Sequence, residues 1–175
     1  MCIRDRFGRE QQAKAFFDAQ AAHIEPILEK EKTGLSVAFF AVASDGTITV
    51  RKPNDYVSSM IELAGGTYSL NGYVPEEENA LSTLKMQMED FYAAEKDADI
   101  LIYNGTIEGE LTSIAELVQK NSLFADFKAV KSGQVYTTGN NFYQQTSGTC
   151  DFIEDLNKVL NGETDAEYRF LKKIN

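Results

Sequence analysis

Residues 35–43 read LSVAFFAVA, an uncharged run of β-branched, aromatic and small side chains that decides how this chain folds. Such a run is typical of a strand buried on both faces of a sheet, and it is too short for a buried helix. ADILIY at 98–103 and GQVYT at 133–137 are predicted to be further strands. The turn SDGT at 44–47 predicts that residues 48–50 return as a short strand.

Helical segments separate these strands. Apolar residues recur at three- to four-residue steps in residues 8–32, 54–64, 111–120 and 150–160. The pattern predicts amphipathic helices there, and a last helical stretch over 165–172. Strands that alternate with such helices predict an α/β fold of three layers, in which helices flank a central, mainly parallel sheet.

The charge balance limits what the chain binds. Its 175 residues include 27 acidic and 17 basic side chains, which gives a formal net charge of -10. This charge disfavours nucleic acids and anionic membrane surfaces, because a phosphate backbone is bound by clustered lysine and arginine. The apolar run at 35–43 is far shorter than the ~20 residues of a membrane-spanning helix, so we expect no direct membrane insertion.

Residue types for catalysis or metal binding are scarce. His23 is the only histidine, and Cys2 and Cys150 are the only cysteines. Neither a zinc-binding pattern nor a Ser-His-Asp triad can be assembled from them, and the sequence has no glycine-rich phosphate loop. We therefore expect no enzyme activity, no cofactor and no metal site, and we interpret His23 as a surface residue of its helix.

Polar and aromatic side chains gather after the predicted strands. Ligands of parallel α/β sheets bind beyond the carboxyl ends of the strands. Those ends are the loops 51–56, 103–106 and 140–145, which carry tyrosines, amides and the basic pair Arg51 and Lys52. This mixture suits a large, partly apolar small molecule that can be anionic.

The order of four segments resembles the C-terminal lobe of the substrate-binding proteins of bacterial ABC importers for iron-siderophore, haem and cobalamin compounds. The segments are GRE at 8–10 with Ala13, YVSSMIELAGG at 56–66, MEDFYAAEKDADILIY at 88–103 and AVKSGQVY at 129–136. The resemblance implies an inter-lobe helix over residues 7–33 and a C-terminal lobe over residues 34–175, with the family's N-terminal lobe missing. We interpret residues 1–6 (MCIRDR) as a non-native start of a truncated chain, so that an upstream portion with any export signal has been lost.

The resemblance also implies a function outside the cytoplasmic membrane. The full-length protein, periplasmic or a cell-surface lipoprotein, would capture an iron complex (a siderophore or haem) or a corrinoid and deliver it to the ABC permease subunits. Glu89 matches the family's permease-docking glutamate in this lobe. The family's ligand cleft corresponds to the three loops, where the candidate ligand-binding residues are Arg51, Tyr56, Tyr103, Asn104, Tyr143 and Gln144.

Three alternatives remain open from the sequence. The α/β pattern also fits a flavodoxin-like cofactor-binding module or enzyme domain, although the turn at 44–46 is a poor phosphate loop. A related receptor for bare zinc or manganese ions would place histidines and carboxylates in the cleft, and the single His23 argues against it. The third alternative is an interaction domain that binds no small molecule.

Overall fold

Strand β1 (Ser36–Val42) lies at the centre of a seven-stranded mixed sheet. The computed structural model describes residues 8–74, 81–163 and 166–175. Next to β1 lies β5 (Ile100–Tyr103), followed by β6 (Val135–Thr138), and these three strands run parallel. The predicted buried strands are confirmed, because each of the three sequence runs forms one of these parallel strands.

Antiparallel strands flank this parallel centre. β2 (Ile48–Arg51) and β4 (Thr83–Met86) extend the sheet from the other side of β1. β7 (Leu171–Lys173) pairs with β6 at the opposite edge. The short β3 (Thr67–Tyr68) pairs in parallel with the first residues of β1, where β2 makes no pairing.

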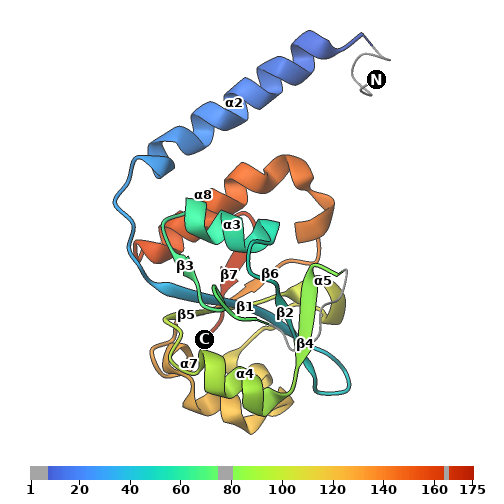
Figure 1. The fold of residues 1–175 in the computed structure, drawn as a ribbon, viewed down its shortest axis with the longest axis vertical. Coiled ribbons are helices and arrows are strands. Elements are labelled where there is room, and N and C mark those ends of the chain that lie inside the picture. Colours follow the sequence, from blue (N-terminus) through green and yellow to red (C-terminus); the bar gives the residue numbers. More distant parts are fainter. Residues whose placement is uncertain (1–7, 75–80, 164–165) are drawn as a thin grey trace.

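Helices cover both faces of the sheet (Figure 1). α3 (Tyr56–Leu63) and α8 (Thr149–Leu160) lie on one face, and α4 (Met88–Glu95) and α7 (Lys128–Lys131) lie on the other. The predicted three-layer α/β fold is therefore confirmed. Further helices are α5, α6 and three short 3-10 helices, which span Gly105–Glu108, Ile114–Lys120, Ser122–Asp126, Phe142–Gln144 and Thr146–Gly148.

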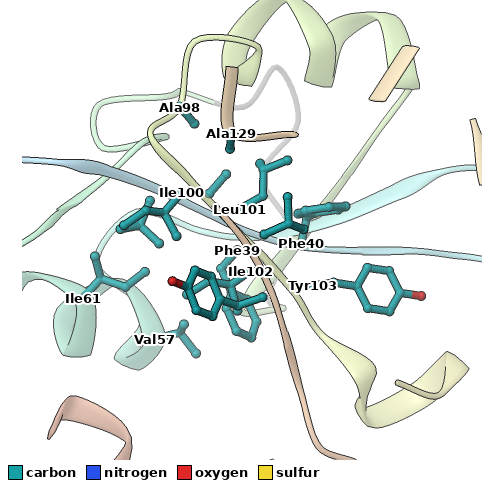
Figure 2. Packing of buried hydrophobic residues seen from close by; sticks show 14 of the residues in the cluster. Phe39, Phe40, Val57, Ile61, Ala98, Ile100, Leu101, Ile102, Tyr103 and Ala129 are labelled. Atoms are coloured by element: carbon teal, nitrogen blue, oxygen red, sulfur yellow. The ribbon is translucent and has the colours of Figure 1, made fainter. Parts of the chain in front are cut away.

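Apolar side chains fill the space between the sheet and both helical layers. Figure 2 shows Val57 and Ile61 of α3 packed against the strands. On the α4 face, the ring centroid of Phe40 lies 4.9 Å from that of Phe91 and 5.4 Å from that of Phe124. Each such ring stabilises the fold by roughly 1.5–3 kcal/mol through the apolar surface that it buries.

Helix α2 (Glu10–Leu28) extends away from the sheet and contacts the rest of the chain mainly through α8 (Figure 1). It ends at Leu28, before residue 33, the predicted limit, and it continues past Pro26, which lacks only its own hydrogen bond to the preceding turn. None of the helices in the described ranges combines the length and the apolar character needed to cross a bilayer. The expected non-native start at residues 1–6 lies outside the described residues.

The helix predicted over residues 165–172 is wrong, because residues 171–173 form β7. The buried carboxylate of Asp155 in α8 accepts hydrogen bonds from the backbone amides of Arg169, Phe170 and Leu171, at 2.9, 2.7 and 3.2 Å. These bonds hold an extended chain beside β6, which gives that strand a partner on its outer edge. An apolar pattern as short as this one fits either structure, and the edge of the sheet decides between them.

Candidate functional site

Arg51 is the last residue of β2, and its side chain is only 9% exposed. Its guanidinium donates hydrogen bonds to Ser82 Oγ at 3.0 Å, to Tyr56 Oη at 3.2 Å and to Tyr143 Oη. The guanidinium carbon lies 5.1 Å from the ring centroid of Tyr56 and 4.9 Å from that of Tyr143, within the range of a cation–π contact. These partners hold one positive charge in a fixed position between two aromatic rings.

The strand register explains why distant loops meet at Arg51. Phe40 of β1 lies opposite Val50 of β2 on one side and opposite Tyr103 of β5 on the other. Arg51 and Asn104 directly follow these two partners, so both lie within one residue of the same level of the sheet. Ligands of open α/β sheets bind beyond the carboxyl ends of the parallel strands, and Asn104 follows such an end at β5. Arg51 ends the antiparallel β2 and lies on the other side of the Phe40 level, so the expectation that loop 51–56 follows a carboxyl end of the parallel sheet is wrong.

Asp55 adds a carboxylate to the group. Its Oδ2 lies 3.4 Å from Arg51 Nη1, and its side chain is 7% exposed. Asp55 is the N-cap residue of α3, yet its side chain makes no capping hydrogen bond, and Oδ2 has no hydrogen-bond partner among the described residues. Because the desolvation of a buried ion pair offsets much of its attraction, this pair is better explained by a role in the site than by stability.

Asn104 fixes the position of Tyr143. Its Oδ1 accepts a hydrogen bond from the amide of Thr106 at 3.2 Å at the start of α5, and its Nδ2 donates to Tyr143 Oη at 2.8 Å. Gly105 approaches β6 so closely that a Cβ there would lie 2.4 Å from the carbonyl oxygen of Thr138. The loops after β5 and β6 are therefore locked together beside Arg51.

Two cavities meet at Arg51 and Tyr143, which line both. The larger cavity, of about 490 Å³, is also lined by Tyr56, Met60, Ser82, Phe142, Gln145 and Phe152. The smaller, of about 140 Å³, lies over small side chains of β1 and β2 and is also lined by Ala41, Ala43, Thr49, Asn104, Ile107 and Glu108. A mostly apolar lining with a few convergent polar groups is usual for a small-molecule site.

The two tyrosine hydroxyls present donors to these cavities. Because the oxygens of Tyr56 and Tyr143 accept hydrogen bonds from Arg51, their hydroxyl hydrogens are available to a ligand. Burial raises the pKa of Tyr56 to about 12 despite the opposing effect of Arg51, so this hydroxyl stays protonated at neutral pH. The arrangement fits a ligand that combines ring faces with oxygen acceptors.

Four of the six predicted ligand-binding residues lie together here, namely Arg51, Tyr56, Asn104 and Tyr143. Tyr103 lies elsewhere: it is fully buried, and its ring meets Phe40 edge-on at 5.8 Å on the α4 face of the sheet. Figure 2 shows Tyr103 among the buried core residues. We therefore leave Tyr103 out of the candidate site.

Gln144 is exposed and lines neither cavity, whereas the next residue, Gln145, lines the larger one. Asp55 and Ser82 are two partners of Arg51 that were not predicted from the sequence. Asp55 lies in the predicted loop 51–56, but nothing in the sequence indicates that its carboxylate contacts Arg51. Ser82 lies beside β4, and only the antiparallel pairing of β2 with β4 brings it close.

Glu89, the predicted docking residue, belongs to the helical layer on the other face of the sheet from α3 and α8 (Figure 1), and it lines neither cavity. It is exposed in the first turn of α4. A carboxylate is also favoured there by the helix dipole. Its exposure makes the side chain accessible to a partner protein.

Comparison with known sequences identifies a family. The sequence model of the family described as periplasmic binding protein matches residues 5–142. An uncharacterized lipoprotein of Methanocaldococcus jannaschii is 24% identical over 159 residues, which cover 90% of this chain and 36% of that protein. The chain thus spans about a third of the length of this curated relative.

Solved structures share the fold at low sequence identity. A TroA-like periplasmic binding protein FepB from Veillonella parvula has a TM-score of 0.70 and 14% identity, and the match covers 99% of this chain and 59% of that one. The periplasmic heme binding protein HutB of Vibrio cholerae has a TM-score of 0.66 and 14% identity over 93% and 60% of the two chains. The siderophore periplasmic binding protein from the fuscachelin gene cluster of Thermobifida fusca has a TM-score of 0.63 and 18% identity over 89% and 55%. The matched regions correspond to somewhat more than half of each solved chain.

Proposed function

Because this chain belongs to the periplasmic binding protein family, we propose that it supplies the C-terminal lobe of the substrate-binding component of an ABC importer. Its role is to hold a small molecule and present it to a permease, with no chemical step of its own. The single observation that carries the proposal is the convergence of Arg51, Tyr143 and Asn104 on one hydrogen-bonded group between two cavities. Asn104 and Tyr143 of that group follow parallel strands β5 and β6, beyond whose carboxyl ends ligands of open α/β sheets bind.

The proposed ligand is an iron complex, either a ferric siderophore or haem, or a corrinoid. Proteins that share the fold are named for siderophore and heme binding, which supports this class. The cavities support it independently, because they offer the ring faces of Tyr56 and Tyr143, a fixed guanidinium and apolar surface. A large chelate with oxygen atoms on its rim fits such a lining.

The proposal places the protein outside the cytoplasmic membrane, in the periplasm or as a lipoprotein on the cell surface. The lipoprotein of M. jannaschii supports an extracytoplasmic site of action. Docking on the permease is assigned to Glu89, whose exposed position on α4 leaves the ligand cavities uncovered. The negative charge of the carboxylate would pair with basic residues of the permease.

A titration tests the proposed ligand. The protein is titrated with a ferric catecholate, a ferric hydroxamate, haemin and cyanocobalamin, and binding is followed by calorimetry and by quenching of tyrosine fluorescence. We expect one class to bind, and Tyr143→Phe to weaken it roughly tenfold, because a hydrogen bond and its orientation by Asn104 are lost. Gln144→Ala is the matched control, since Gln144 is adjacent in sequence but lines neither cavity.

The outcomes separate the alternatives. Equal losses of ligand affinity in the Tyr143→Phe and Gln144→Ala variants would reject the assigned site. Binding of FMN in place of all four probes would favour the flavodoxin-like alternative.

A further inference from the structure

His23 of α2 faces two carboxylates of α8 at the contact that joins α2 to the lobe. Its Nε2 lies 2.8 Å from Glu154 Oε2, and its Nδ1 lies 3.9 Å from Asp151 Oδ1. Asp151 and Glu154 are three residues apart and therefore lie on one face of α8. One ligand atom from each residue lies within 4.8 Å of the other two.

Two basic residues bind the carboxylate oxygens that do not face His23. Arg169 Nη1 binds Asp151 Oδ2 at 2.5 Å, and Lys158 Nζ binds Glu154 Oε1 at 2.9 Å. In each carboxylate, one oxygen therefore forms an ion pair with a basic side chain, and the other oxygen faces His23. Outer partners of this kind orient metal ligands in metalloproteins.

From this arrangement we infer that His23, Asp151 and Glu154 form a binding site for a divalent transition metal ion, with zinc as the best match. One imidazole nitrogen and two carboxylate oxygens suit zinc, whereas calcium and magnesium prefer oxygen ligands alone. A tetrahedral zinc ion with bonds of about 2.0 Å requires ligand atoms about 3.3 Å apart. The ligand atoms lie within 4.8 Å of one another and the two carboxylates face different nitrogens of the ring, so zinc binding requires the partly exposed side chains to rotate towards one imidazole nitrogen. The side chains are 35%, 21% and 36% exposed, which leaves room for water as the fourth ligand.

The site would fasten the helix to the lobe. α2 contacts the rest of the described chain mainly through α8, and a metal ion bound to residues of both helices would fix the angle between them. The site is separate from the ligand cavities, because none of its three residues lines either of them. Its failure and the failure of the proposed transport role are therefore distinguishable.

The single histidine makes the test specific. Zinc is titrated into the chain carrying Cys2→Ser and Cys150→Ser, so that no thiol contributes, and the imidazole of His23 is followed by nitrogen-15 NMR. We expect one equivalent of zinc to shift the only imidazole signals and to raise the melting temperature, while magnesium at the same concentration does neither. We expect His23→Gln and Glu154→Gln each to lower zinc affinity at least tenfold.

Glu25→Gln is the matched control, because Glu25 is exposed on the same helix and lies outside the cluster. It should bind zinc as tightly as the parent protein. Zinc binding that leaves the imidazole signals unshifted, or that survives His23→Gln unchanged, would overturn the inference. Should His23→Gln fail to fold by circular dichroism, the Glu154→Gln titration, read at the intact imidazole, decides the question.

Discussion

The side-chain amide of Asn104 donates a hydrogen bond to the phenolic oxygen of Tyr143 at 2.8 Å and joins the end of β5 to the loop after β6. Tyr143 accepts a second hydrogen bond from Arg51 at the end of β2. One phenol therefore connects segments that lie far apart in sequence. A change at any of these three residues should be detected at the other two.

Replacing Asn104 separates its two roles. Asn104→Ala removes both the cap of α5 and the donor to Tyr143, so we expect a loss of about 0.5–2 kcal/mol in the free energy of unfolding, together with weaker ligand binding. Asn104→Asp keeps an oxygen for the cap and removes the amide donor, so it should retain most of the stability and lose affinity. Urea unfolding and ligand titration measure the two effects, and equal stability losses in both variants would contradict the assignment.

Arg51 and Asp55 should behave as a coupled pair. Arg51→Met leaves the buried Asp55 carboxylate without its counter-charge, so we expect a cost of about 3–5 kcal/mol in the free energy of unfolding. The double variant Arg51→Met with Asp55→Asn should be less destabilised than the sum of the single variants, because no unpaired charge remains. A double-mutant cycle from urea unfolding measures the coupling, and additive single effects would show that the two side chains act independently.

The sequence predicts the central strands well because each is a short, uncharged run of residues that favour strands and are buried on both faces of the sheet. The regular alternation of side chains along a strand explains why Tyr103 was wrongly predicted to lie in the site. Side chains alternate along a strand, so Tyr103, opposite Phe40, points to the α4 face, while Asn104 begins the loop and reaches the cleft. Sequence spacing alone does not show at which residue a strand ends. It also does not show which of the neighbouring residues Gln144 and Gln145 lines the larger cavity.

Contacts between distant residues could not be predicted in this way. His23 and Glu154 are 131 positions apart, and Arg51 and Tyr143 are 92 apart. Their proximity depends on the packing of α2 against α8 and on the strand order, which a single sequence does not specify. Edge strand β7 likewise depends on the exposed edge of β6 and on Asp155.

Glu89 should matter for delivery and not for ligand binding. In the complete protein, Glu89→Ala should reduce uptake by cells that carry the importer, because the carboxylate that pairs with the permease is lost. Ligand affinity measured by calorimetry should stay the same, since the residue is remote from both cavities. Asp90→Ala, exposed in the same first turn of α4, is the matched control and should leave uptake intact. Unchanged uptake in the Glu89 variant would reject the docking assignment.

Glu95 should make the stability of the fold depend on pH. It is 1% exposed on α4, its carboxylate oxygens make no well-formed hydrogen bond among the described residues, and the nearby Ser69 hydroxyl only partly offsets the effect of burial on its pKa. Burial raises the pKa of Glu95 from 4.5 to about 7. Between these two values the folded protein binds a proton that the unfolded chain has released, so stability is greatest below pH 4.5 with respect to this group, falls as the pH rises to about 7, and is constant above that.

Glu95→Gln removes this dependence, because glutamine is a neutral side chain of the same shape. At pH 8 the variant should exceed the parent protein by about 3 kcal/mol in the free energy of unfolding, at about 1.4 kcal/mol per pKa unit, and the difference should shrink towards pH 5. Urea unfolding at both pH values measures it. Glu89→Gln, exposed in the first turn of the same helix, should change the free energy of unfolding by the same small amount at both pH values. If the difference between Glu95→Gln and the parent is the same at pH 5 and pH 8, Glu95 does not change its protonation on unfolding.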